Sequence, residues 1–374
     1  MEKKGFLSTI LRILPGFLML AVTLYLLRTF AEPWMKNFVL FGVKGWLASV
    51  LSLNYILLAI IAGMFYRNVL FGGKIPAWAE DGFRTTRLFI KAGVIMLGSL
   101  YTVQNLLRLG STAMILILSF VFGTLLLVLM LGKLFKANRS VTAVMGAACG
   151  VCGVSAAVAT SPGVQAKPVD LALSVATILG FGILTMFISP FIGKSIGLSD
   201  AQFGAWVGTG ILNSGQVLAT CLAFNPVIAE GTAVYYGEIW NVIRVITIPF
   251  VVFVLSIWYW RGVGKEEAGD AAQLSLAEIF VTKFPVFVLG FFGMTALSSL
   301  GWLGPSGSET LALVREFMQW IFGIGLVGLG AYIDVREIKA AGGAPLRIGL
   351  IAGTTKYLLA LLIILLFVPK DGSF

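Results

Sequence analysis

The sequence predicts an all-α polytopic membrane protein with about eleven transmembrane helices. Of its 374 residues, 58% are apolar and 12% are charged, whereas about a quarter of the residues in an ordinary soluble domain are charged. The apolar residues form long continuous runs, not the alternating pattern of a β-barrel. The basic residues gather in alternate loops, which is typical of helical membrane proteins. Composition therefore excludes a soluble enzyme, a disordered chain and a secreted disulfide scaffold.

The spans are predicted where apolar stretches approach the roughly 20 helical residues that cross a bilayer core. They fall at 11–30, 54–71, 88–107, 112–132, 140–165, 169–192, 203–223, 238–260, 279–299, 312–333 and 346–368. The stretch 36–53 is shorter and carries Lys44, so we expect an interfacial helix there. Counting it as a further crossing would reverse every later loop and remove the charge bias. The N-terminus is therefore predicted to be cytoplasmic and the C-terminus periplasmic.

The ten spans after the first are expected to form two inverted repeats of five. The predicted domains are 1–53 for the first helix and the interfacial helix, 54–193 for repeat 1, and 194–374 for repeat 2. Weak traces of the repeat exist, since Gly63 stands five residues before Asn68 and Gly208 stands five residues before Asn213. Interrupted spans at matching positions in two halves are typical of a transporter site.

Two glycine-rich runs predict helices that break inside the membrane. They are Val141–Pro162 and Phe322–Tyr332. Glycine lets the backbone leave the helical region, and the N–H groups that begin a half-helix attract anions. Close packing of unbroken helices through small residues is the alternative for each run. Their equivalent places in the two repeats favour two discontinuous crossing helices.

The run Cys152–Thr160, followed by Pro162 and Lys167, resembles the signature of the YeiH-like sulfate-exporter family. Weaker matches extend over most of residues 54–368. The resemblance implies a prokaryotic inner-membrane protein whose fold is similar to that of sodium/proton antiporters and bile-acid-type sodium symporters. In that fold two broken helices cross near the membrane midplane, and core and panel domains are interleaved between the repeats.

The chain departs from this family at several positions. Leu212 and Asn213 stand where the family has a His-Glu pair, and Asn241 stands where it has a lysine. Lys356 stands where the last helix is typically aromatic. These differences remove candidate proton carriers and add a cation, so they argue against the family's ordinary coupling.

Polar and charged residues inside the spans are the candidate site, because charges in a bilayer are costly and rare. The expected substrate-binding residues are Cys149, Gly150, Cys152, Gly153, Ser155, Asn213, Gln216, Gly325, Gly328 and Lys356. Asn213 and Gln216 would share one helix face at i, i+3, with interhelical hydrogen bonds as the alternative.

Three further charges are expected to act through electrostatics or gating. Lys91 and Arg244 would stabilise an anion or the C-termini of half-helices, and snorkelling to the membrane surface is an equal alternative for both. Glu238 is the best remaining proton-carrying carboxylate, with an interfacial position as the alternative. Cys149 and Cys152 match a redox motif without its usual context, so packing is the favoured interpretation.

The predicted function is secondary transport of a small anion, such as sulfate or a sulfonate, by alternating access. The alternatives are a cation (sodium)/proton antiporter of the same fold and, less favoured, a membrane redox protein using Cys149 and Cys152. We expect no enzymatic activity, no cofactor and no metal, because the chain has three cysteines and no histidine. The expected partners are the anionic substrate, a coupling Na⁺ or H⁺, and the lipid bilayer. Nucleic acid is not expected despite the net charge of +10, because no basic cluster carries aromatic residues, and a homodimer is left open.

Overall fold

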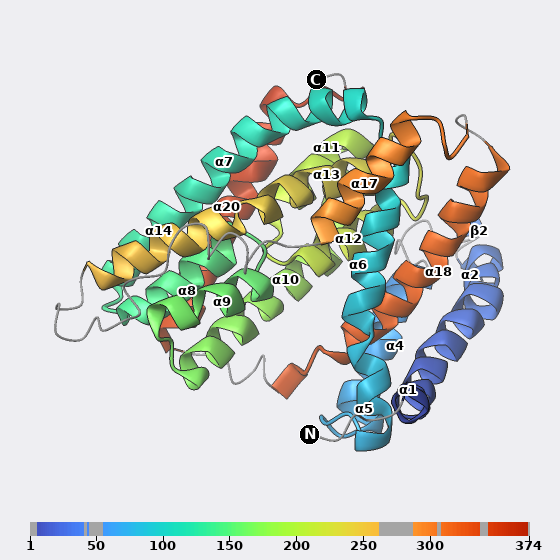
Figure 1. Cartoon of the computed structure of the whole chain (residues 1–374), viewed down its shortest axis with the longest axis horizontal. Helices are drawn as coiled ribbons and strands as arrows, with labels where there is room; N and C mark the ends of the chain where they lie inside the picture. The colour runs from blue at the N-terminus through green and yellow to red at the C-terminus, as the bar shows by residue number, and fades with distance from the viewer. Residues whose placement is uncertain are drawn as a thin grey trace. The chain divides into compact units, whose positions relative to one another are not determined.

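The structure is a computed structural model that describes residues 6–40, 43–44, 55–261, 287–304, 308–336 and 343–372. Almost all of the described chain is helical (Figure 1). Within the described residues, six helical segments are long and apolar enough to cross a membrane: Ile10–Met35, Ala113–Leu134, Val169–Ser195, Ala233–Trp260, Glu309–Ala331 and Gly343–Phe367. Shorter apolar helices occur at Leu58–Leu70, Ser214–Phe224 and Phe287–Ser299. The predicted all-α polytopic fold is confirmed, whereas the number of eleven crossings stays a prediction.

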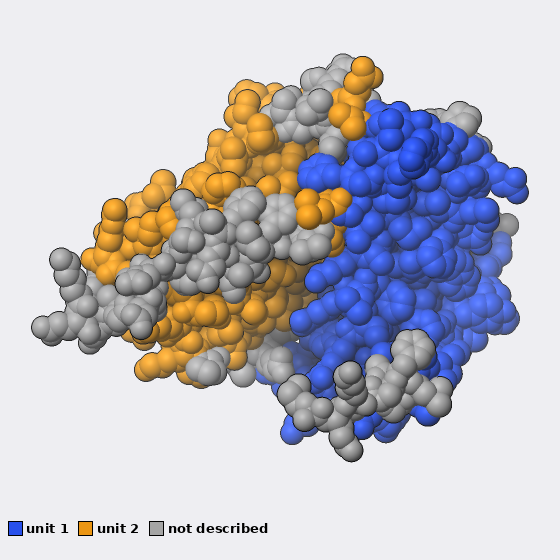
Figure 2. Space-filling view, in the orientation of Figure 1, with its two compact units in different colours: residues 1–102, 222–229, 290–336 blue, residues 103–221, 230–289, 337–374 orange. Residues whose placement is uncertain are grey.

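The chain divides into two compact units, which Figure 2 distinguishes by colour. Unit 1 comprises residues 1–102, 222–229 and 290–336, and unit 2 comprises residues 103–221, 230–289 and 337–374. Each unit therefore takes segments from both predicted repeats. The repeat boundaries themselves stay a prediction.

Unit 1 is built around the long helix α18. Its helices are α1 (Phe6–Leu26), η1 (Leu27–Ala31), α2 (Glu32–Asn37), α4 (Tyr55–Phe65), η2 (Tyr66–Leu70), α5 (Ala77–Arg84), α6 (Thr86–Leu97), η3 (Gly98–Leu100), most of α17 (Phe287–Ser299) and α18 (Glu309–Ala331). Ser308 starts α18 by accepting a hydrogen bond from Leu311 N–H, as an N-cap does. α18 then packs against α4, α6 and α1, and α1 packs against α5.

The break predicted within Phe322–Tyr332 is wrong, because α18 is continuous from Glu309 to Ala331. Its glycines serve close packing. A Cβ on Gly330 would collide with the backbone of Ile60 in α4, and one on Gly325 would lie 2.7 Å from the Ile90 side chain in α6. The alternative of small-residue packing therefore holds for this helix.

Part of the predicted interfacial helix at 36–53 is also wrong. Val39–Leu40 (β1) pairs antiparallel with Val43–Lys44 (β2), with Val39 opposite Lys44. β-branched valines are less suited to a helix than to an extended chain. Residues 41–42 and 45–53 of this prediction lie outside the described residues.

Unit 2 contains the helices α7 (Val103–Leu134), α8 (Arg139–Gly150), α9 (Val154–Thr160), η4 (Pro162–Val164), α10 (Pro168–Ser195), α11 (Asp200–Gly210), most of α12 (Ser214–Phe224), α13 (Ala233–Ile246), α14 (Ile248–Trp260) and α20 (Gly343–Phe367). Pro168 opens α10 at a position where its missing N–H costs nothing. A capping box between Ser199 and Gln202 opens α11. α20 packs against α7, α8, α10 and α11, so it touches both segments that break.

Candidate functional site: two helix breaks and their buried cations

The first helix break lies between α8 and α9, and it confirms the break predicted within Val141–Pro162. α8 ends at Gly150 and α9 begins at Val154. Val151 has φ −105° and ψ −96°, outside the helical region, and Gly153 has φ +74°. A φ of this sign is open to glycine and strained for most other residues. Gly153 is therefore the residue that lets the chain leave the helix.

The second break lies between α11 and α12, inside a segment that the sequence predicted as one span over 203–223. α11 ends at Gly210 and α12 begins at Ser214. Ile211 is extended, with φ −72° and ψ 132°. A signal for this break exists in the sequence, because Gly210 and the run Asn-Ser-Gly that begins at Asn213 are turn-forming residues inside an apolar stretch.

Asn213 lies in this break and not on a helix face. Its side-chain Oδ1 accepts a hydrogen bond from the Gly215 N–H at 3.2 Å, and its backbone carbonyl accepts from Gln216 and Val217 at 3.0 and 3.1 Å. The predicted i, i+3 pair of Asn213 and Gln216 on one helix is therefore wrong. Asn213 instead caps the first turn of α12.

The two breaks touch each other. A Cβ on Gly153 would lie 3.0 Å from the Leu212 carbonyl oxygen and 3.1 Å from Asn213 Cα. Only a residue without a side chain allows this approach of two backbones. The structure therefore brings two broken helices into contact, although the second one is α11–α12 and not the predicted Phe322–Tyr332.

Lys356 closes the first half-helix. It lies within α20 and is 2% exposed, and its Nζ donates hydrogen bonds to the carbonyl oxygens of Cys149 at 2.8 Å and Gly150 at 3.0 Å. These are terminal carbonyls of α8, which have no partner within that helix. The ammonium group thus meets the negative end of the α8 dipole.

Tyr357 holds α20 in the orientation that directs Lys356 toward α8. Its carbonyl oxygen accepts a hydrogen bond from Trp206 Nε1 of α11 at 3.0 Å, and the two rings lie 4.8 Å apart. Its hydroxyl lies 2.7 Å from Ser189 Oγ of α10. Contacts to two neighbouring helices therefore set the rotation of α20 and direct Lys356 toward α8.

Arg244 closes the second half-helix in the same way. Its side chain is 0% exposed, and Nη1 donates to the carbonyl oxygens of Thr209 at 3.2 Å and Ile211 at 2.6 Å. These carbonyls stand where α11 ends. Snorkelling is therefore wrong for Arg244, and each half-helix that leads into a break ends on a buried cation.

Asn241 links Arg244 to a buried carboxylate and to the start of α12. Its Oδ1 accepts from Arg244 Nη2 at 3.0 Å and from Ser214 Oγ at 2.7 Å, and its Nδ2 donates to Glu238 Oε2 at 3.1 Å. Glu238 is 1% exposed, so its carboxylate is buried instead of lying at an exposed interfacial edge. Its Oε1 has no hydrogen-bond partner within the described chain. Asn241 and Ser214 belong to this cluster, although the sequence did not single them out as ligands.

The remaining predicted residues of the breaks differ in exposure. Cys149 and Cys152 are buried free thiols. Ser155 itself is exposed. Gln216 is buried, and its Nε2 donates to the Leu179 carbonyl at 3.2 Å. Across the described residues, no group of three or more His, Cys, Asp or Glu side chains is placed to hold a metal ion.

Lys91, Gly325 and Gly328 belong to unit 1, whereas both breaks lie in unit 2. Lys91 is exposed on α6. Gly325 and Gly328 are packing positions in α18, the latter against Thr86 of α6. These three residues stay predictions as functional residues.

Comparison with known proteins places the chain in a family. A family model described as "Conserved hypothetical protein 698" matches residues 37–349. A UPF0324 membrane protein of Nitratidesulfovibrio vulgaris (strain Hildenborough) is 71% identical over the whole of both chains. A second UPF0324 membrane protein of the same organism is 33% identical over 98% of this chain and 96% of the relative. The UPF0324 membrane protein SAG1125 of Streptococcus agalactiae is 27% identical over 79% and 83%, respectively.

No solved structure matches this chain. The family model spans most of the sequence, including both helix breaks and Arg244. The chain is therefore a member of the UPF0324 family of multi-pass membrane proteins, the same family as the YeiH-like proteins that its sequence resembles.

Proposed function

We propose that this protein is a secondary transporter that moves a small anion, such as sulfate or an organic sulfonate, across the inner membrane by alternating access. The observation that carries the proposal is the contact between the two breaks, with a buried cation on each half-helix that enters them. Interrupted helices are tolerated inside a membrane where they are buried in protein or line a cavity.

The sign of the substrate charge follows from which ends of the half-helices are already neutralised by protein side chains. Lys356 and Arg244 neutralise the carbonyl ends of α8 and α11. The opposite ends, where α9 and α12 begin, keep the positive pole of the helix dipole. Exposed Ser155 lies at the start of α9 and carries a hydroxyl donor, whereas the Ser214 hydroxyl at the start of α12 already donates to Asn241. An anion meets hydrogen-bond donors and positive potential there, which offsets part of its desolvation.

A cation/proton antiporter of the same fold is the second candidate, and Glu238 is the observation that favours it. A buried carboxylate with one oxygen unpartnered in the described chain is a natural proton carrier. The hydrogen bond that joins it to the second break runs to Asn241, however, whereas two cations bond directly to the carbonyls at the half-helix ends. The local charge therefore favours an anion.

Redox chemistry at Cys149 and Cys152 is the least supported candidate. Both thiols are buried and unpaired. The Cys149 carbonyl already accepts the Lys356 ammonium where α8 ends, and this role needs no change in oxidation state.

The proposal is tested by reconstituting the purified protein in liposomes and measuring uptake of labelled sulfate and of a small organic sulfonate under sodium, proton and anion gradients. We expect at least one anion to accumulate. Lys356→Met should lower the rate by at least about tenfold, which is the effect of about 1.4 kcal/mol on a barrier. Lys133→Met is the control, because Lys133 is exposed in α7.

Two further variants separate the candidates. Glu238→Gln should leave anion uptake measurable, and a sodium- or proton-linked flux that this variant abolishes would support the antiporter instead. Cys149→Ser with Cys152→Ser should keep most of the anion flux, whereas complete loss would favour redox chemistry. If no anion moves under any gradient, the anion-transport proposal is wrong.

A further inference from the structure

Unit 1 contains a basic cavity that uses none of the residues at the helix breaks. The cavity has a volume of about 650 Å³ and is lined by four basic side chains, Arg67, Lys74, Arg84 and Arg87, together with Glu80 and Tyr332. Small-molecule sites occupy roughly 300–1,000 Å³. The cavity is therefore large enough for an anionic group and some of the molecule attached to it.

Two of the four cations already have carboxylate partners. Arg67 Nε lies 3.3 Å from Asp334 Oδ2, and Arg84 Nη2 lies 2.7 Å from Glu80 Oε1. Lys74 and Arg87 have no carboxylate partner in the described part of the chain, and both are exposed. The cavity thus keeps two positive charges that no carboxylate among the described residues neutralises.

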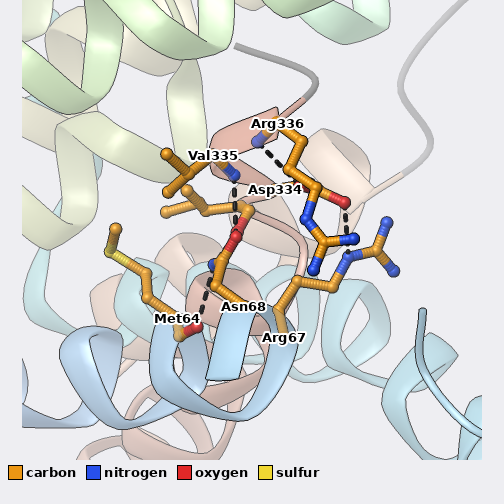
Figure 3. A network of polar contacts seen from close by, with 7 residues as sticks. Met64, Arg67, Asn68, Asp334, Val335 and Arg336 are labelled. Atoms are coloured by element: carbon orange, nitrogen blue, oxygen red, sulfur yellow. Dashed lines mark hydrogen bonds and ion pairs between the residues drawn. The ribbon is translucent and has the colours of Figure 1, made fainter. Parts of the chain in front are cut away.

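Asp334, the ion-pair partner of Arg67, lies in a segment that Asn68 holds in place (Figure 3). The side chain of Asn68 donates to the Ile333 carbonyl at 2.8 Å and accepts from the Val335 N–H at 2.8 Å. Asp334 Oδ1 accepts from the Arg336 N–H at 2.8 Å. These bonds tie the segment after α18 to η2, so Tyr332 and Arg67 face the cavity from a fixed frame.

A tight turn places Lys74. Gly72 and Gly73 have φ +59° and +101°, and the Gly73 N–H donates to the Arg67 carbonyl at 2.7 Å. The Arg336 side chain lies over Gly73, where a Cβ would come within 2.8 Å of its Nη1. The φ angle of +101° is what favours glycine at this position, because the Arg336 side chain is flexible and can move aside.

Tyr332 adds a hydrogen-bond donor and an aromatic wall. The Arg87 guanidinium lies 5.4 Å from the centre of its ring, which holds the cation against an apolar surface. The phenolic hydroxyl can donate a hydrogen bond to an anion.

We infer that this cavity binds a phosphate-bearing ligand, with Lys74 and Arg87 on the phosphate oxygens and Tyr332 and Ile75 beside its organic part. Arginine and lysine both suit phosphate oxygens, and such charge-assisted bonds are stronger than neutral ones. The segment that carries Lys74, Arg84 and Arg87 belongs to the face predicted to be cytoplasmic, where basic pockets meet anionic lipid headgroups as well as soluble organic phosphates. The shared chemistry is the phosphate group.

Binding is tested on the purified full chain by thermal shift and by titration with four probes. Inorganic phosphate and glycerol phosphate are soluble, and short-chain phosphatidylglycerol is compared with short-chain phosphatidylcholine. A ligand that binds only the folded protein raises its unfolding temperature. Stabilisation by the soluble probes identifies a free organic phosphate, whereas stabilisation by phosphatidylglycerol but not phosphatidylcholine identifies a lipid headgroup. Either result supports the inferred site.

The variants show whether the probes bind in this cavity. Lys74→Gln with Arg87→Gln should weaken the effective probe at least about tenfold, since a hydrogen bond to a charged group contributes about 1.5–3 kcal/mol. Tyr332→Phe keeps every charge and should weaken it about threefold. Lys133→Gln with Arg261→Gln removes two exposed charges elsewhere and should change affinity less than twofold. Equal losses in both double variants, or no binding of any probe by the unmodified protein, would overturn the inference.

Discussion

Lys356 Nζ lies 2.8 Å from the carbonyl oxygen of Cys149, a residue more than two hundred positions earlier in the chain. This bond joins α20 to the end of α8 at the point where the helix breaks. A buried lysine is costly unless polar groups surround it. Here the same bond satisfies both the ammonium group and a helix end that lacks partners.

Replacing this cation should therefore destabilise unit 2. Lys356→Met leaves the Cys149 and Gly150 carbonyls unpaired, which costs about 1–3 kcal/mol each, offset in part by the burial of one charge fewer. We expect a net loss of about 2 kcal/mol, measured as a lower unfolding temperature in detergent. Lys133→Met, at an exposed position of α7, should have little effect. An unchanged unfolding temperature for Lys356→Met would show that the cap is dispensable.

Gly153 should tolerate no side chain. Its φ of +74° is strained for alanine, and a Cβ would lie 3.0 Å from the Leu212 carbonyl oxygen. We expect Gly153→Ala to lower stability by about 1–3 kcal/mol and to reduce anion flux in liposomes. Gly123→Ala is the matched control, because Gly123 lies in α7 with nothing near its Cβ position. That variant should gain about 0.5–1 kcal/mol of stability from helix propensity.

The sequence predicted the first break and misplaced the second for one physical reason. A glycine in an apolar run shows that no Cβ is present at that position, but it does not show the structural reason. At Gly153 the cause is a positive φ, whereas at Gly330 it is the backbone of α4. Sequence spacing does not separate these causes, because the second depends on which helix packs alongside.

The sequence singled out the charged residues as functional, but it did not identify the groups to which they bond. Lys356 and Arg244 stand out in the sequence because charges are rare in apolar spans. Their acceptors lie on α8 and α11, far away along the chain. The role of Asn241 as a bridge was also out of reach, since it depends on Ser214 and Glu238 meeting the same amide.

Asn241 should be as important to stability as either charge it contacts. Asn241→Leu has similar volume but removes one partner each from Glu238, Ser214 and Arg244. Buried polar groups left unpaired cost about 1–3 kcal/mol each, so we expect a loss of about 3 kcal/mol. Chemical denaturation in detergent measures it. Asn138→Leu is the control, because the exposed Asn138 side chain makes no capping bond, and an equal loss there would contradict the bridging role.

The glycines of α18 should act on the packing of unit 1 and not on the helix breaks. Gly330→Ala places a Cβ against the Ile60 backbone, which cannot rotate away, and overpacking of this kind costs about 1–3 kcal/mol. Gly293→Ala, in α17 with open space at its Cβ, should be neutral or slightly stabilising. Hydrogen exchange measures where the loss appears. We expect faster exchange in α4 and α18 for Gly330→Ala, with α8 and α11 unchanged, whereas faster exchange confined to α8 and α11 would mean that α18 supports the breaks after all.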